Sequence, residues 1–103
     1  GLSVVHSTYQ HQYHIVWGTK YRRKFLNPYV TAHLLESLYD TVKAYPTLHL
    51  EAVNADEDHV HLQIEIPPNL SIATAVQVLK ARSSIHLRCT FAFIRDMYPE
   101  GGV

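Results

Sequence analysis

The sequence predicts an α+β fold of the ferredoxin-like split βαβ type, in which an antiparallel sheet carries helices on one face. Two observations lead to this fold class. Segments with alternating polarity and segments with helical periodicity follow one another in the order β-α-β-β-α. The segment at residues 59–66 also alternates apolar and polar residues throughout, as a strand does when helices cover only one face of its sheet.

The first expected element is a strand at residues 12–18, in which Tyr13, Ile15 and Trp17 share one side. We expect the two aromatic rings to lie in the core. A basic loop at residues 20–24 follows this strand.

A helix is predicted at residues 28–44. Asn27 is a good cap for the first free N–H groups, and Pro28 suits the first helical position. Apolar residues then recur at helical spacing until Pro46 stops the run.

A second strand at residues 48–55 and a third at 59–66 are predicted to form a hairpin around the acidic turn at residues 56–58. The apolar side chains of the third strand should face the helices. Its other side chains should lie on the open face, and these are His59, His61, Gln63 and Glu65.

Ser71 is the expected cap of a second helix, whose exposed side carries Lys80 and Arg88. Phe91 and Phe93 follow it and are expected in the core. The fourth strand of the fold is due after this point and is missing or truncated. We therefore expect one domain over residues 1–103 that is incomplete at its C-terminal end.

Overall composition excludes several classes of protein. Nine Lys and Arg residues balance nine Asp and Glu residues, so a nucleic-acid partner would have to be bound by a local patch. The single cysteine, Cys89, cannot form an intrachain disulfide, and no apolar run approaches the ~20 residues that span a bilayer. We expect a cytoplasmic protein without a membrane segment.

His59 and His61 form the strongest candidate site. Side chains at i and i+2 of a strand project from one face about 6.5 to 7 Å apart, which lets two imidazoles converge on one ion. Asp58 or Glu65 can orient a ring from behind. The alternative reading is that two histidines decorate a solvated face.

The candidate DNA contacts are positively charged or aromatic residues near this face, with His14 close by if the first and third strands are neighbours. Tyr21 offers a surface on which a base can stack. The alternative readings are a solvated charge run in the loop and an ordinary polar helix face. The candidates are Lys20, Tyr21, Arg22, Arg23, Lys80 and Arg82.

Three blocks of the chain resemble a known family. They are the strand at residues 14–17 running into the basic loop 20–24, the strand at 58–62, and the helix segment 80–88. Together they are similar to the single-tyrosine HUH transposases of the insertion-sequence "two hundred" group. The resemblance spans roughly residues 9–98.

The resemblance implies a homodimeric enzyme that nicks and rejoins single-stranded DNA at hairpins near the ends of a mobile element. It implies a divalent metal, Mg or Mn, held by His59 and His61. A tyrosine on a later helix attacks the phosphate and forms a 5′-phosphotyrosine bond, which conserves the bond energy for resealing.

The chain stops before that helix, and none of its seven tyrosines matches the position of the nucleophile, Tyr98 included. We therefore expect it to bind single-stranded DNA without cutting it. Two alternatives stay open. One is a histidine-triad-like nucleotidyl transferase, because the residues from His59 to Gln63 are similar to that motif; the other is a non-catalytic single-strand binding module.

Overall fold

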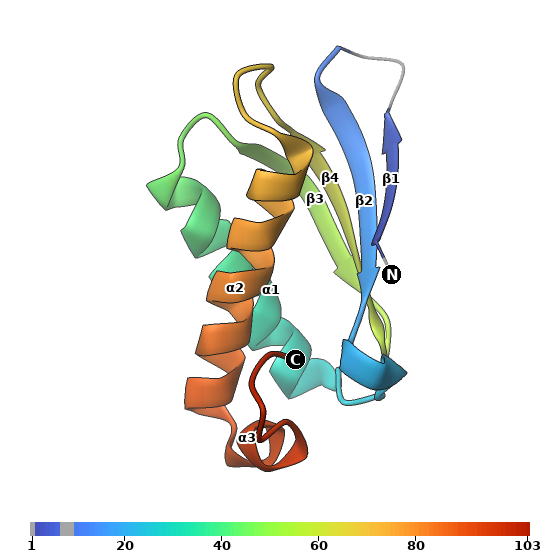
Figure 1. Cartoon of the computed structure of the whole chain (residues 1–103), viewed down its shortest axis with the longest axis vertical. Coiled ribbons are helices and arrows are strands. Elements are labelled where there is room, and N and C mark those ends of the chain that lie inside the picture. Colours follow the sequence, from blue (N-terminus) through green and yellow to red (C-terminus); the bar gives the residue numbers. More distant parts are fainter. Residues whose placement is uncertain (1, 7–9) are drawn as a thin grey trace.

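The computed structural model describes residues 2–6 and 10–103, and it shows a sheet with helices on one side (Figure 1). In chain order the elements are β1 (Leu2–His6), β2 (Gln12–Gly18), a short 3₁₀ helix η1 (Lys20–Arg22), α1 (Pro28–Ala44), β3 (His49–Ala55), β4 (His59–Glu65), α2 (Ile72–Thr90) and α3 (Ala92–Met97). No helix in the described ranges is both long and apolar enough to cross a membrane.

The sheet has four antiparallel strands in the order β1-β2-β4-β3, which confirms the predicted fold class. One expectation is corrected. The fourth strand was expected after the second helix, but it lies at the N-terminal end of the chain as β1 and pairs with β2. All five residues of β1 are exposed, so its sequence has no buried face that would have revealed it.

The core lies between the sheet and the layer formed by α1 and α2. The apolar side of β4 is buried as predicted, and α1 and α2 contribute the opposite wall. The aromatic residues expected in the core behave differently from one another: Trp17 is buried, Tyr13 and Phe91 are half-buried, and Phe93 is exposed. The fully buried side chains of this core include Ile15, Val30, Leu38, Leu62, Ile64, Ile66, Leu79, Leu87 and Ile94.

Both helix starts are capped as the sequence predicts. The side chain of Asn27 accepts a hydrogen bond from the N–H of Val30 at 3.0 Å. Ser71 Oγ accepts one from the N–H of Thr74, also at 3.0 Å. Each cap satisfies a backbone donor that has no partner inside its helix.

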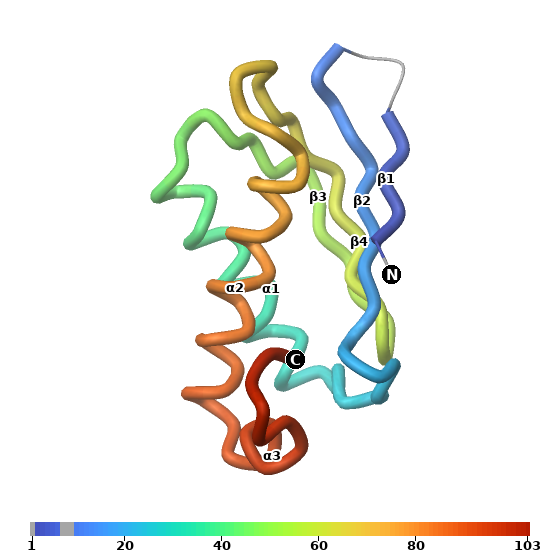
Figure 2. The backbone as a smooth tube through the Cα atoms, in the orientation of Figure 1, coloured from blue at the N-terminus to red at the C-terminus, as the bar shows by residue number. Residues whose placement is uncertain are grey.

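The C-terminal segment returns to the basic 3₁₀ helix, as the backbone trace shows (Figure 2). The hydroxyl of Tyr98 donates to the carbonyl of Lys20 at 2.6 Å. Lys20 in turn donates its backbone N–H to Val103 at 2.8 Å and its Nζ to the carbonyl of Gly101 at 2.7 Å. Gly101 and Gly102 turn the chain there with positive φ angles of 103° and 74°, which glycine adopts without strain.

Candidate metal and DNA site

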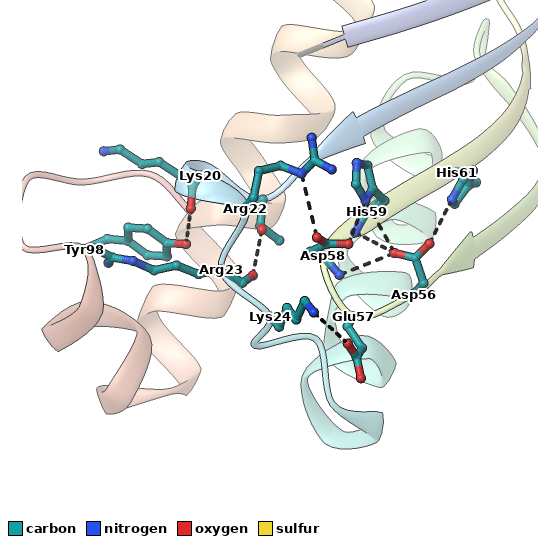
Figure 3. A network of polar contacts seen from close by, with 11 residues as sticks. Lys20, Arg22, Arg23, Lys24, Asp56, Glu57, Asp58, His59, His61 and Tyr98 are labelled. Atoms are coloured by element: carbon teal, nitrogen blue, oxygen red, sulfur yellow. Dashed lines mark hydrogen bonds and ion pairs between the residues drawn. The ribbon is translucent and has the colours of Figure 1, made fainter.

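The two predicted histidines lie on the open face of the sheet, at the end of β4 nearest the basic segment (Figure 3). Their ring centroids are 6.4 Å apart, as expected for neighbours on one strand face. The His59 side chain is 24% exposed and that of His61 37%, so solvent and ligands reach both. On β2, His14 adds a third ring 6.3 Å from that of His61.

Two carboxylates from the turn before β4 contact these rings. His59 Nδ1 lies 2.7 Å from Asp58 Oδ1 and 3.7 Å from Asp56 Oδ1. Asp56 Oδ2 lies 3.5 Å from His61 Nε2. Because Asp58 engages Nδ1 of His59, it fixes the ring and leaves Nε2 for another ligand.

The turn itself holds Asp56 in place. Its Oδ1 accepts backbone hydrogen bonds from His59 at 2.8 Å and from Asp58 at 3.3 Å. Loss of solvent raises the pKa of Asp56, but these hydrogen bonds and the contact with His61 outweigh it and leave the pKa below its usual value. Asp56 is therefore an anion under ordinary conditions.

The donor set fits a divalent cation. Ligand atoms of Asp56, Asp58 and His59 lie within 4.8 Å of one another. His61 adjoins this group through Asp56. Imidazole nitrogens with carboxylate oxygens suit ions from Mn to Zn, and carboxylate oxygens suit Mg. The two histidines are predicted from the sequence and Asp56 is not, although the acidic turn directly before His59 is a usable signal.

Gly18 keeps the space beside His59 open. The register places it opposite His59, and a Cβ added there would lie 3.0 Å from Arg22 Cδ and 3.5 Å from His59 Nε2. A larger side chain would therefore push the Arg22 chain or the His59 ring away. Glycine lets the guanidinium and the imidazole share one corner of the sheet.

Arg22 is the cation that the structure brings next to the histidines. Its Nε lies 3.7 Å from Asp58 Oδ2, and its side chain is 61% exposed. Tyr21 and Arg22 both have left-handed backbone angles, with φ of 59° and 56°, which are rare for residues other than glycine. Such strain of about 1–3 kcal/mol per residue is typical of functional turns.

The other basic residues predicted to contact DNA lie in two places: Lys20 and Arg23 in the loop, and Lys80 and Arg82 on α2. Arg23 donates to the carbonyl of Met97 at 2.5 Å, and Lys20 pairs with Glu100 at 2.9 Å, so both cations also hold the C-terminal segment. Lys80 lies on the helix layer, with its Nζ 5.7 Å from the centre of the Trp17 ring.

Lys80 also lines, together with Lys20, a cavity of about 620 Å³ between α2 and β2. Arg82 is exposed on α2. The structure therefore brings Arg22 next to the histidines, uses Lys20 and Arg23 to hold the C-terminal segment, and places the two helix candidates on the other layer.

Tyr98, the tyrosine nearest the end of the chain, is packed inside the fold. It is fully buried, its ring packs edge-on against Phe25 at 5.8 Å, and burial raises the pKa of its hydroxyl. A buried phenol that donates to a backbone carbonyl is a poor nucleophile. Tyr21 and Tyr29 are well exposed, while Tyr9 lies outside the described residues.

Comparisons with known protein families and with individual proteins all match transposases of one type. Residues 7–102 match the family described as "Transposase IS200 like". The chain is 29% identical over 96 residues to the transposase for insertion sequence element IS200 of Salmonella typhimurium, with 93% of this chain and 62% of that protein covered. It is 34% identical over 88 residues to the ISDra2 transposase TnpA of Deinococcus radiodurans, with 85% and 62% covered.

Among solved structures, a putative transposase from Deinococcus radiodurans superposes with a TM-score of 0.78 at 30% identity, covering 86% of this chain and 68% of the other. The chain thus spans about three fifths of the length of the curated relatives it matches. Since the family match extends over nearly all of its residues, the chain belongs to the IS200-like transposase family.

Proposed function

We propose that this domain binds single-stranded hairpin DNA at the ends of a mobile element and presents one phosphate to a metal held by His59 and His61. The observation that supports this most is the convergence of the two imidazoles, Asp58 and Arg22 at one corner of the open sheet face. A metal ion bound there, Mg or Mn, would stabilise charge on the phosphate as a Lewis acid.

Each residue of the proposed site has a separate role. His59 and His61 hold the ion, and Asp58 keeps the His59 ring oriented through its 2.7 Å contact. Arg22 neutralises a phosphate oxygen, for which a guanidinium is well suited because it donates two parallel hydrogen bonds. Gly18 leaves room for both.

We further propose that no tyrosine of the described ranges attacks the DNA, so that residues 2–6 and 10–103 bind it without cleaving it. The test is incubation of a labelled hairpin oligonucleotide with protein and Mn, followed by a denaturing gel that retains covalent adducts. A salt-sensitive mobility shift without nick or adduct agrees with the proposal. An adduct contradicts the absence of a nucleophile, and peptide mapping would identify the tyrosine.

The DNA contact itself is testable through salt. Three or four neutralised phosphates give a log-log slope of roughly −2 to −3 on single strands. Arg22→Ala should reduce that slope by about 0.7. The matched control is Lys43→Ala, which also removes one exposed cation but in the last turn of α1. That end of α1 lies away from the basic 3₁₀ helix (Figure 1). Equal slopes for both variants would refute the placement of DNA beside Arg22.

The same salt series, run with and without Mn, separates the alternatives. A non-catalytic binding module would show the salt slope with no dependence on Mn. The nucleotidyl-transferase alternative has no support from the comparisons, which identify a transposase family across residues 7–102.

We also propose a homodimer. β1 is an edge strand whose Leu2, Val4 and Val5 are 46%, 38% and 59% exposed, and proteins normally cover such edges. Light scattering at high protein concentration should report twice the chain mass. A monomer under those conditions would refute the dimer while leaving the metal site untouched.

A further inference from the structure

A second pair of histidines lies on the helix layer, on the opposite side of the sheet from His59 and His61. His33 on α1 and His86 on α2 place Nδ1 and Nε2 3.1 Å apart, with ring centroids 5.3 Å apart. Both side chains are half-buried. Phe91 packs edge-on against the His33 ring at 5.2 Å and an interplanar angle of 89°, which limits how far that ring can turn.

The two nitrogens have the spacing of ligands that share one ion. At a Zn–N distance of 2.0–2.1 Å, tetrahedral ligands have nitrogens about 3.3 Å apart. The observed 3.1 Å needs only a small rotation of the rings to reach this arrangement. In the absence of metal, one neutral ring donates its N–H to the other, so the same contact exists with a proton in place of the ion.

The chemistry of the pair favours a narrower class of metal than that of the first site. No carboxylate or thiolate joins His33 and His86 in a three-ligand group anywhere in the described ranges. Imidazole nitrogens alone favour the late first-row ions Ni, Cu and Zn, whereas Mg and Mn prefer carboxylate oxygens. Water would complete the coordination sphere.

We propose that His33 and His86 form a separate site for a late first-row divalent ion, which joins α1 to α2. Metal bound there would stabilise the helix layer, because an ion that binds the folded chain more tightly than the unfolded chain shifts the equilibrium toward the folded state. The proposal does not depend on the DNA-binding function, since neither residue lies on the open face.

The experiment uses Ni²⁺ as the probe and a His59→Ala/His61→Ala protein as the parent, so that the open-face pair cannot account for binding. Excess Ni²⁺ should raise the parent's Tm by ~5 °C or more. Adding His33→Gln or His86→Gln should abolish the shift. The matched control is His49→Gln, which removes an exposed histidine on β3 and should leave the Ni²⁺-induced shift in Tm unchanged.

Calorimetry at low temperature provides a readout that does not depend on thermal stability. The parent should bind one Ni²⁺, and either glutamine variant should weaken binding by more than the roughly 10–100-fold that loss of an outer-shell partner costs. Unchanged affinity in both His33→Gln and His86→Gln, or no binding by the parent, would overturn the proposal.

Discussion

Tyr98 is predicted to be a structural residue, and two substitutions separate the contribution of its hydrogen bond from that of its ring packing. Its hydroxyl holds the basic segment through the carbonyl of Lys20, and its fully buried ring fills space against Phe25. Tyr98→Phe removes only the hydrogen bond. Tyr98→Ala removes the ring as well.

The expected magnitudes follow from these contacts. Loss of one hydrogen bond costs about 0.5–1.5 kcal/mol. For a domain of this size 1 kcal/mol corresponds to roughly 4–8 °C in Tm. By analogy with buried Phe→Ala changes, Tyr98→Ala should cost about 3–5 kcal/mol, a large part of the 5–15 kcal/mol that stabilises a typical domain.

Urea unfolding followed by circular dichroism measures both values, and Tyr29→Phe is the control because Tyr29 is 80% exposed. That control should stay within about 0.5 kcal/mol of wild type. If Tyr98→Phe proved as stable as wild type and Tyr98→Ala only slightly less stable, Tyr98 would not be a structural residue. The inference that it is unsuited to attack DNA would then also fail.

Three further predictions concern other elements. Asn27→Ala should destabilise the protein by about 1 kcal/mol in urea unfolding, since it removes the cap of α1; no change would mean that the cap is dispensable. Gly18→Val should weaken Mn binding, measured by calorimetry, because its side chain would displace Arg22 or His59; unaltered binding would show that the space is not needed. The hydrogen bond from Lys20 holds the pKa of Glu100 below its usual value, so this contact stabilises the fold above about pH 4.5 and is lost as the pH falls through the lowered pKa. Glu100→Gln should therefore show a shallower loss of Tm between neutral pH and pH 3, and identical profiles would contradict the contact.

Local sequence patterns predicted those parts of the fold that depend on burial and capping. The alternation in β4, the caps at Asn27 and Ser71 and the stop at Pro46 all act over a few residues, so they are visible in the sequence. β1 was not predicted because an exposed edge strand is held by backbone pairing, which leaves no polarity pattern.

Only the part of the candidate site that depends on local geometry can be predicted from the sequence. His59 and His61 follow from strand geometry, but the position of Arg22 depends on two left-handed residues and on the glycine opposite His59. The contact between Tyr98 and Lys20 joins residues 78 positions apart, and no local pattern reports it. Long-range contacts of this kind decide which of the basic residues hold the C-terminal segment and which stay exposed beside the histidines.

Calorimetric titration with Mn²⁺ tests the central claim most directly, because two ligand sets share His59. If the histidine pair holds the ion, His59→Ala and His61→Ala should both abolish or sharply weaken binding, and Asp58→Asn should weaken it by about 10–100-fold. His49→Ala, an exposed histidine away from the site, should bind as wild type does. If His61→Ala binds Mn²⁺ with wild-type affinity while Asp56→Asn does not, the ion belongs to the carboxylate group of the turn, and the proposed histidine site is wrong.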